Sequence, residues 1–329
     1  MTSFKPRRLF LSSLLAAMGL AVPLAPAWAQ PFPSKPVRIV IGFPPGGGID
    51  IVARTIAPKL SEALGQPVII DNKPGVAGVL GTNLVAKAPA DGHTIFFGTT
   101  GNISINPVFM PNLPFNMDKD FTPLMLVASL PFLVYAHPSV PVKSLSELVA
   151  YAKANPGKIN FYSSGNGGLP HLTGELLNNV AGIQTVHIAY KGSAPGMNDL
   201  IGGQVQLGYD TVAIGLQHIK TGRLRALATT GPKRLAILPD VPSTSEFASG
   251  LEAVNWYGMV VPAGTPRDVI LRLNREITKV LEMPDIKEKL VSQGIDPAAN
   301  SPEEFGEFMK SEAAKWARVI RAANIKPDS

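Results

Sequence analysis

The stretch from Val37 to Asp50 reads VRIVIGFPPGGGID. Residues 37–43 are an uninterrupted run rich in branched aliphatic side chains, as in a strand buried in a parallel sheet. Beyond the glycines, apolar residues recur at helical spacing as far as Leu64, and Gly65 is placed to end the helix. A buried strand, a glycine-rich loop and an amphipathic helix in this order predict an α/β unit.

The same alternation continues along the chain. Outside the opening stretch, strands are predicted at 68–71, 93–99, 130–136, 158–162, 184–188, 207–210, 224–229 and 255–261. Helices are predicted at 78–88, 169–180, 194–202, 213–221, 267–281 and 302–323, with a further helix opened by the capping-box pattern of Ser144 and Glu147. Residues 107–141 carry seven prolines and suit a crossing between domains.

This order of elements predicts a two-lobed α/β fold, each lobe a mostly parallel sheet flanked by helices. Lobe 1 is predicted to comprise 30–128 plus 254–329, and lobe 2 to comprise 129–253. Ligands of open α/β sheets collect at the carboxyl ends of the strands, so we expect a binding cleft between the lobes.

The N-terminus resembles an export signal. Lys5, Arg7 and Arg8 precede an apolar run, and Ala27-Trp28-Ala29 is a small-x-small cleavage site, so residues 1–29 are expected to be removed. The run is short and broken by prolines, which disfavours a membrane anchor. The paired arginines suit a twin-arginine signal, and Sec export is the alternative. The mature protein is expected outside the cytoplasm.

Composition excludes several classes of protein. The chain has 45% hydrophobic and 16% charged residues, so it has the apolar side chains for a large core. The absence of cysteine excludes disulfides and thiolate metal sites, and the five histidines show no ligand spacing, so we expect no metal and no cofactor. The net charge of +6 falls to +3 without the signal, and no basic stripe is present; we therefore expect no nucleic-acid partner.

The first candidate site is the loop from Phe43 to Asp50. Three consecutive glycines allow close approach of backbone N–H groups, and the following helix adds the positive end of its dipole, so an anion is the natural occupant. The loop lacks the GK[ST] of a P-loop and does not match GxGxxG. A tight turn without a ligand is the alternative. Asp50 is expected either to cap the helix or to hold the loop or a water from beneath.

A second loop, Ser163-Ser-Gly-Asn-Gly-Gly168, follows a strand of the second unit, and His171 stands early in the next helix. Two such loops, one per lobe, are expected to face each other and clamp a carboxylate. His171 is a candidate ligand contact or a structural residue. Trp256 and Tyr257, on the return strand, are expected to pack at the hinge. The candidate ligand-binding residues are Phe43, Pro45, Gly46, Gly47, Gly48, Asp50, Thr99, Thr100, Asn102, Ser163, Ser164, Gly165, Asn166, Gly167, His171, Tyr190, Gly192 and Asp210, several of which are equally explained as turn-forming residues.

A rival hypothesis is an exported hydrolase that uses Ser163 or Ser164 with His171. The sequence has no GxSxG nucleophile elbow, so no catalytic residue is predicted.

Seven stretches carry a family resemblance along the whole mature chain. They are FPPGGGIDIVAR (43–54), NKPGVAGVLGTNLVAKAPADGHT (72–94), SSGNGGLPHLTGELL (163–177), AYKGSAPGMNDLIGGQVQ (189–206), GRLRALATTGPKR (222–234), LPDVPSTSEF (238–247) and WYGMVVPAGTP (256–266). Together they resemble the substrate-binding receptors of tripartite tricarboxylate transporters, the Bug family.

The resemblance implies a periplasmic, non-enzymatic receptor of the type II periplasmic-binding (Venus flytrap) fold. Its expected ligand is a di- or tricarboxylate, an amino acid or an aromatic acid, held by main-chain groups and small polar side chains of the two loops. The protein is expected to be monomeric, and its expected partner is a set of membrane transporter subunits or, alternatively, a sensor kinase. Two departures from the family pattern, Ile49 and the sequence Asn166-Gly-Gly-Leu169, bear on which ligand is bound.

Overall fold

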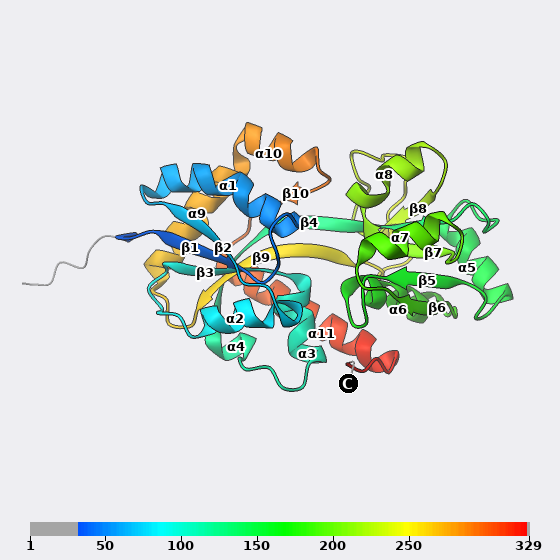
Figure 1. The fold of residues 1–329 in the computed structure, drawn as a ribbon, viewed down its shortest axis with the longest axis horizontal. Coiled ribbons are helices and arrows are strands. Elements are labelled where there is room, and N and C mark those ends of the chain that lie inside the picture. The colour runs from blue at the N-terminus through cyan, green and yellow to red at the C-terminus, as the bar shows by residue number, and fades with distance from the viewer. Residues whose placement is uncertain (1–31, 328–329) are drawn as a thin grey trace, which may run out of the picture.

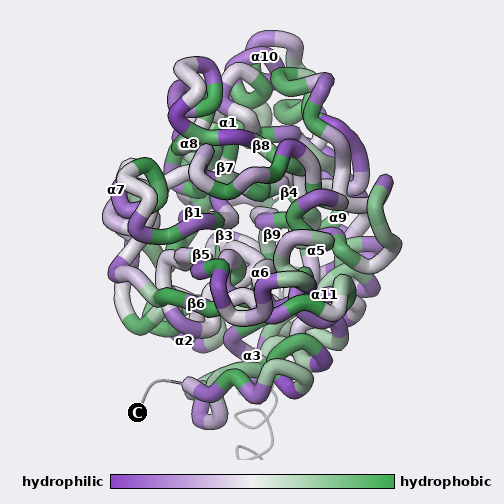
Figure 2. The backbone as a smooth tube through the Cα atoms, turned by 90° about the vertical axis from the view of Figure 1, so that its right-hand side faces the viewer, coloured by the Kyte–Doolittle hydropathy of each residue, from purple (hydrophilic) through white to green (hydrophobic). Residues whose placement is uncertain are grey.

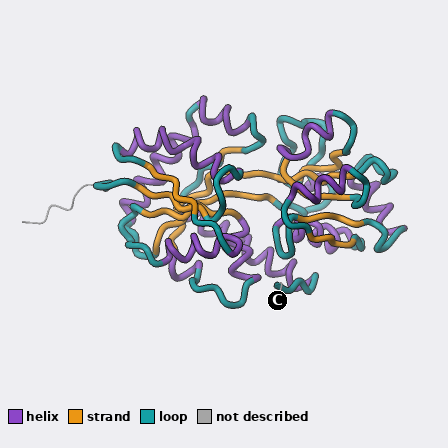
Figure 3. The backbone as a smooth tube through the Cα atoms, in the orientation of Figure 1, coloured by secondary structure: helices purple, strands orange, loops and turns teal. Residues whose placement is uncertain are grey.

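A computed structural model describes residues 32–327 of the chain. The predicted export signal at 1–29 lies outside the described residues. Within 32–327, no helix combines the length and the apolarity needed to cross a membrane. Figure 1 shows the two lobes side by side, and Figure 3 shows that strands form the centre of each, with helices on both faces.

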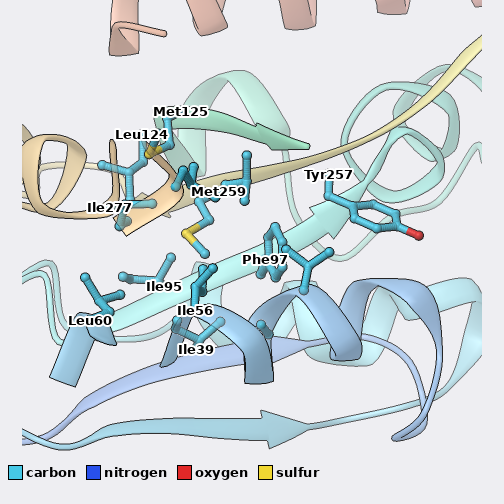
Figure 4. Close-up of a cluster of buried hydrophobic side chains, with 14 of the residues drawn as sticks. Ile39, Ile56, Leu60, Ile95, Phe97, Leu124, Met125, Tyr257, Met259 and Ile277 are labelled. Carbon is cyan, nitrogen blue, oxygen red and sulfur yellow. The ribbon is translucent and has the colours of Figure 1, made fainter. Parts of the chain in front are cut away.

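Lobe 1 is built on the opening stretch of the sequence. Strand β1 (Val37–Ile41) lies between β2 (Val68–Asn72) and β3 (Thr94–Thr99), and all three are parallel. The return strand β9 (Val254–Pro262) pairs antiparallel with β3. The helices of this lobe are α1 (Gly48–Leu64), α2 (Val79–Ala86), α9 (Arg267–Glu282) and α10 (Pro284–Val291). Its core contains aliphatic side chains from β1, α1 and α9, together with Phe97 and Tyr257 (Figure 4).

Lobe 2 repeats the parallel pattern. Strand β5 (Asn160–Ser163) lies between β6 (Val186–Ala189) and β7 (Leu207–Thr211), again in parallel. Strand β8 (Arg225–Thr229) pairs antiparallel with β4 (Phe121–Ala136). The helices are α5 (Leu145–Ala154), α6 (Leu169–Ala181), α7 (Ser193–Ile201) and α8 (Val212–Lys220). Figure 2 shows hydrophilic and hydrophobic segments alternating along the outer helices, as expected when one face of a helix packs on a sheet.

One long strand joins the lobes. Strand β4 (Phe121–Ala136) pairs with β9 as far as Pro131 and with β7 and β8 from Phe132 onward. The sequence predicted only the second part of it, at 130–136, because Pro123 interrupts the pattern before it. The register shift after Pro123 accommodates that proline. The two-residue strand β10 (Asp296–Pro297) also pairs with β4. The sheet is therefore mixed, with its antiparallel strands at the crossing.

The last helix, α11 (Pro302–Ala322), also spans both lobes. Phe305 and Met309 pack in a lobe 1 cluster with Trp256, whereas Trp316, Val319 and Ile320 pack in the main core of lobe 2. The assignment of all of 254–329 to lobe 1 stays a prediction. The second half of α11 packs against lobe 2, as the contacts of Trp316, Val319 and Ile320 show.

Several short elements were not predicted, because no sequence pattern indicated them. They are a π-turn at Gly101–Ile105 (η2), α3 (Asn106–Phe109), α4 (Met117–Asp120) and two 3₁₀ turns, Val76–Gly78 (η1) and Thr244–Glu246 (η3).

Candidate functional site

The carboxyl ends of the parallel strands in the two lobes face each other across the molecule (Figure 1). Three loops follow β1, β2 and β3 on the side of lobe 1, and three follow β5, β6 and β7 on the side of lobe 2. Because helices α1, α6, α7 and α8 begin at these loops, their N-termini also lie at this edge.

In the loop from Phe43 to Asp50, the exposed residues are held by a buried carboxylate. Asp50 Oδ2 accepts hydrogen bonds from the Gly46 amide and Arg54 Nε, both at 2.9 Å, and the side chain is buried. Asn72 Nδ2, at the end of β2, donates to both Asp50 Oδ1 and the Phe43 carbonyl at 3.0 Å. Of the two roles predicted for Asp50, holding the loop from beneath is the one observed.

The charge of Asp50 is maintained by these bonds. Burial raises the pKa of the Asp50 carboxyl, but the hydrogen bonds from Arg54, Gly46 and Asn72 outweigh it, so the pKa lies below its ordinary value. The carboxylate is therefore ionised at neutral pH and its acceptor sites are occupied by the loop. The Gly46 and Gly47 backbone is left exposed, and a Cβ at either residue would meet nothing within 4 Å.

Tyr257 lies directly below the first turn of α1. A Cβ added to Gly48 would lie 2.7 Å from the Tyr257 hydroxyl oxygen, so glycine is required there. The Tyr257 ring packs edge-on against Phe97, and its hydroxyl points away from the core (Figure 4). Burial raises the pKa of Tyr257 to about 12, so the hydroxyl keeps its proton at neutral pH. The sequence analysis predicted that this residue packs at the hinge, and the structure places its hydroxyl beside Gly48, in the loop from Phe43 to Asp50.

Thr99 ends β3, Thr100 and Asn102 follow it, and all three bond mostly within lobe 1. Asn102 Oδ1 accepts from the Thr99 amide at 3.2 Å, and Asn102 Nδ2 donates to the Ala77 carbonyl at 2.6 Å. Thr100 is fully buried, and its hydroxyl oxygen accepts from the Trp256 amide at 2.9 Å. Thr99 is half-buried at the edge, whereas the other two support the turn and the return strand.

The second loop is likewise held from below. The Ser163 hydroxyl is buried, donates to the Gly165 carbonyl at 2.9 Å and lies 2.6 Å from His187 Nε2. His171 Nδ1 accepts a hydrogen bond from the Gly167 amide at 3.1 Å, so His171 supports the loop. Ser164, Gly165 and Asn166 remain partly exposed, and the side chain of Asn166 donates to the Lys326 carbonyl at 2.9 Å.

The two histidines stack on each other, with ring centroids 3.5 Å apart and planes 10° apart. Burial, with the neighbouring His187, lowers the pKa of His171 to about 3, and burial lowers that of His187 to about 4. Both rings are therefore neutral at physiological pH. Among the described residues, Ser163 pairs with His187 and not with His171, and it is buried, which is unlike the exposed nucleophile that the hydrolase hypothesis requires.

The second loop also contacts the short helix α3 at Gly167. The φ of Gly167 is +69°, and an added Cβ would lie 2.2 Å from the ring of Phe109, which belongs to α3. Phe109 comes from the segment before the crossing strand and also packs against the main core of lobe 2, so it joins that segment to the second loop.

Asp210 lies near the carboxyl end of β7, on the lobe 2 side. It is buried; Tyr162 donates to it at 3.2 Å and the Thr211 amide at 2.8 Å. Burial raises the pKa of Asp210 despite hydrogen bonds from Ser193, Thr211 and Tyr162. Tyr190 turns its hydroxyl to Asp199 at 2.7 Å, and the amide of Gly192 donates to the Ser164 carbonyl at 3.2 Å. These bonds tie together the three loops of lobe 2.

The predicted residues therefore fall into two layers. The partly or fully exposed layer consists of Phe43, Pro45, Gly46, Gly47, Gly48, Thr99, Ser164, Gly165, Asn166, Tyr190 and Gly192. The buried layer beneath it consists of Asp50, Thr100, Asn102, Ser163, Gly167, His171 and Asp210. Sequence reasoning missed Asn72, Phe109, His187 and the turn at 75–78, because their contacts join residues distant along the chain and leave no local pattern.

Residues 52–325 match the model of the tripartite tricarboxylate transporter family receptors. This chain belongs to that family. A UPF0065 protein encoded in the tcbD-tcbE intergenic region of Pseudomonas sp. strain P51 is 40% identical over 93% of both chains, and BugT of Bordetella pertussis is 33% identical over 96% of this chain and 99% of its own.

Solved structures give the same fold for the receptor. Rpa4515 of Rhodopseudomonas palustris, solved with adipate, superimposes with a TM-score of 0.77 at 34% identity, covering 90% of this chain and all of its own. MatC of the same organism, with bound malate, gives a TM-score of 0.72 at 29% identity, covering 88% of this chain and all of its own. The receptor thus has the two-lobed α/β fold of periplasmic binding proteins, as predicted.

The two departures from the family pattern, at Ile49 and at Asn166-Gly-Gly-Leu169, lie in different lobes of the receptor. Ile49 is 3% exposed and packs in the core of lobe 1, so its side chain is directed away from the edge. Leu169 is similarly buried in lobe 2, and Gly167 before it accommodates Phe109. The expectation that Ile49 bears on the ligand's identity is therefore not supported by its position.

A cavity of about 890 Å³ lies elsewhere on lobe 1 of the receptor, between residues 103–123 and the start of α11. Four of its five charged residues pair with one another, Arg267 with Glu303 and Lys310 with Glu307, and Asp118 is the fifth. Since the cavity lies away from the strand ends and its two cationic side chains are paired, we do not assign the ligand to it.

Proposed function

We propose that the receptor captures a small carboxylate between its two lobes outside the cytoplasm and delivers it to a membrane transporter. The observation that carries this proposal is the pair of loops at opposed strand ends, each presenting backbone at a helix N-terminus. Such loops favour an anion through N–H groups and the helix dipole. Adipate and malate, the ligands in Rpa4515 and MatC, are both dicarboxylates.

In this proposal the exposed layer contacts the ligand and the buried layer sets its geometry. Gly47 and Gly48 supply amides from the lobe 1 loop at 43–50, here called the anion loop, whose Gly46 amide is held by Asp50. Ser164, Gly165 and Asn166 supply polar groups from lobe 2. Thr100 and Asn102 are assigned to support, because their polar groups bond within lobe 1. Contacts made with both lobes would drive closure over the ligand.

The receptor is proposed to be monomeric and without enzymatic activity, and to be exported through its cleaved signal. Delivery to a sensor kinase is the alternative, since a closed form can dock on either partner. Pull-down of membrane proteins with and without the ligand distinguishes the two.

Calorimetry on residues 30–329 tests the binding itself. The panel consists of di- and tricarboxylates, amino acids and aromatic acids, and we expect saturable binding of at least one acid. Gly47→Asp places a negative charge in the open part of the anion loop and is expected to weaken that binding at least about tenfold. The neutral isostere Gly47→Asn is the control. A panel without binding, or equal loss in both variants, contradicts the proposal.

A further inference from the structure

The loop between β2 and α2 contains a strained turn. Val76 and Ala77 have φ values of +47° and +51°, and Gly78 follows at +86°. Only glycine adopts this region without steric cost, and a β-branched residue such as Val76 is an outlier there. Strain of this kind persists where the surrounding structure imposes it, and it is concentrated at functional sites.

Hydrogen bonds and close packing within lobe 1 hold the turn at 76–78 in this strained conformation. The Ala77 carbonyl accepts hydrogen bonds from Asn102 Nδ2 at 2.6 Å and from Asn106 Nδ2 at 3.1 Å, and both asparagines are buried. Gly78 crosses so close to the end of β1 that a Cβ on Gly42 would lie 2.7 Å from its Cα. The turn is therefore fixed over the carboxyl ends of β1 and β3, at the same edge as the anion loop.

The side chain that this turn presents is apolar and exposed. Val76 is 65% exposed and Leu80, at the start of α2, is 54% exposed, more than the other large hydrophobic residues of the described chain. A Cβ added to Gly75 would lie 2.5 Å from the Leu80 side chain, so Leu80 packs on this turn. The side chains of Val76 and Leu80 therefore belong to one turn. A single exposed apolar residue needs no explanation, but here two neighbouring ones lie on a strained turn at the edge where the ligand is proposed to bind. This combination points to an apolar contact at Val76.

We infer that Val76 is a specificity-determining residue of the cleft, which contacts the apolar body of the ligand once the lobes close. This rests on the proposed function. The anion loop holds a carboxylate at one end, and burial of methylene groups against Val76 adds affinity in proportion to their number. The receptor therefore prefers acids with a run of methylene or ring carbons over short acids of the same charge.

Straight-chain dicarboxylates of four, six and eight carbons are the probes, and calorimetry gives their affinities. The wild type is expected to bind the longer acids more tightly than the four-carbon acid. Val76→Thr keeps the branched shape and the backbone strain but adds a hydroxyl, and is expected to weaken the six- and eight-carbon acids about three- to tenfold while changing the four-carbon acid less than about twofold. Val291→Thr, an exposed valine of α10, is the control and leaves all three unchanged.

A second variant separates binding from folding. Val76→Gly relieves the strained backbone, so its melting temperature is expected to equal or exceed that of the wild type while the preference for longer acids is lost. If the acids bind and the ratio of their affinities is the same in the wild type and both Val76 variants, this inference is overturned and the proposed function stands. If none of the three acids, nor any other acid of the calorimetry panel, binds the wild type, both are overturned.

Discussion

Glu312 joins the return strand to the last helix: its Oε2 accepts a hydrogen bond from Trp256 Nε1 at 3.0 Å. The same oxygen accepts from Trp316 Nε1 at 3.1 Å, and Lys315 pairs with the other oxygen. Glu312 is 6% exposed and ties β9 to α11, the helix that packs in both lobes. A buried carboxylate with three donors therefore lies at the crossing.

Replacing Glu312 with alanine is expected to lower the free energy of unfolding by roughly 2 kcal/mol or more, because two buried indole N–H groups lose their acceptor. Urea denaturation measures this. Glu307→Ala, on the same helix but in an exposed pair with Lys310, is the control and is expected to cost less than about 1 kcal/mol. Equal losses in the two variants would show that the carboxylate does not stabilise the crossing.

The same contact predicts an optical signal. Trp256 and Trp316 are the two tryptophans of residues 30–329, and both bond Glu312. The proposed closure of the lobes would move α11 relative to β9. Tryptophan emission is therefore expected to change in intensity or wavelength as ligand is added, with the affinity found by calorimetry. Trp316→Phe keeps one reporter for comparison. A ligand that binds by calorimetry without altering the emission contradicts closure at this hinge.

The anion loop depends on Asn72, which bonds both Phe43 and Asp50. Asn72→Ala removes these two hydrogen bonds and a third, which Asn72 Oδ1 accepts from Arg54, each of about 1 kcal/mol. The loop is then less ordered, and ligand binding is expected to weaken about tenfold. Lys59→Ala, on an exposed part of α1, is the control. Unchanged affinity in Asn72→Ala would mean that the loop keeps its shape without this support.

Features with local causes were predictable from the sequence. Ser144 caps α5 as expected: its hydroxyl accepts from the Glu147 amide, because the two residues lie three positions apart. The Glu147 carboxylate accepts from the Lys143 amide, so only the serine half of the capping box forms as predicted. The strand, glycine loop and helix around Asp50 also follow from neighbouring residues, and so does the loop after β5. The two-lobed fold of the family, which the resemblance implied, is confirmed by the comparisons.

Features with distant causes were not predictable. The contact of Tyr257 with Gly48, of Phe109 with Gly167 and of Asn102 with Ala77 each join separate elements. Glycine at 48 and 167 looks like loop composition in the sequence, and only the neighbouring ring or hydroxyl explains it. His187 was similarly invisible as the partner of Ser163, since it stands on another strand.

The stacked histidines predict a dependence of stability on pH. The folded-state pKa values, about 3 for His171 and about 4 for His187, lie below the ordinary value of 6.5, so the unfolded chain takes up protons first as the pH falls. The free energy of unfolding is therefore expected to decrease between about pH 6.5 and pH 4, by up to about 1.4 kcal/mol per pH unit for each histidine.

The variant His171→Asn retains an acceptor for the Gly167 amide and is expected to show a shallower slope in denaturation measured across this range. His137→Asn, in an exposed turn beside Ser139, is the control. The same slope in the wild type and His171→Asn would rule out His171 as its source.

The contact between Phe109 and Gly167 predicts a coupled pair of substitutions. Gly167→Ala introduces both an unfavourable positive φ and an overlap with the Phe109 ring, and is expected to lower the free energy of unfolding by about 2–4 kcal/mol. Gly182→Ala is matched in φ, at +60°, but its Cβ would meet nothing within 4 Å, so it isolates the backbone cost of about 1–2 kcal/mol. Phe109→Leu in the Gly167→Ala background is expected to recover the difference, because the smaller side chain removes the overlap. If Gly167→Ala costs no more than Gly182→Ala, or if Phe109→Leu recovers nothing, then Phe109 does not press on the lobe 2 loop in solution.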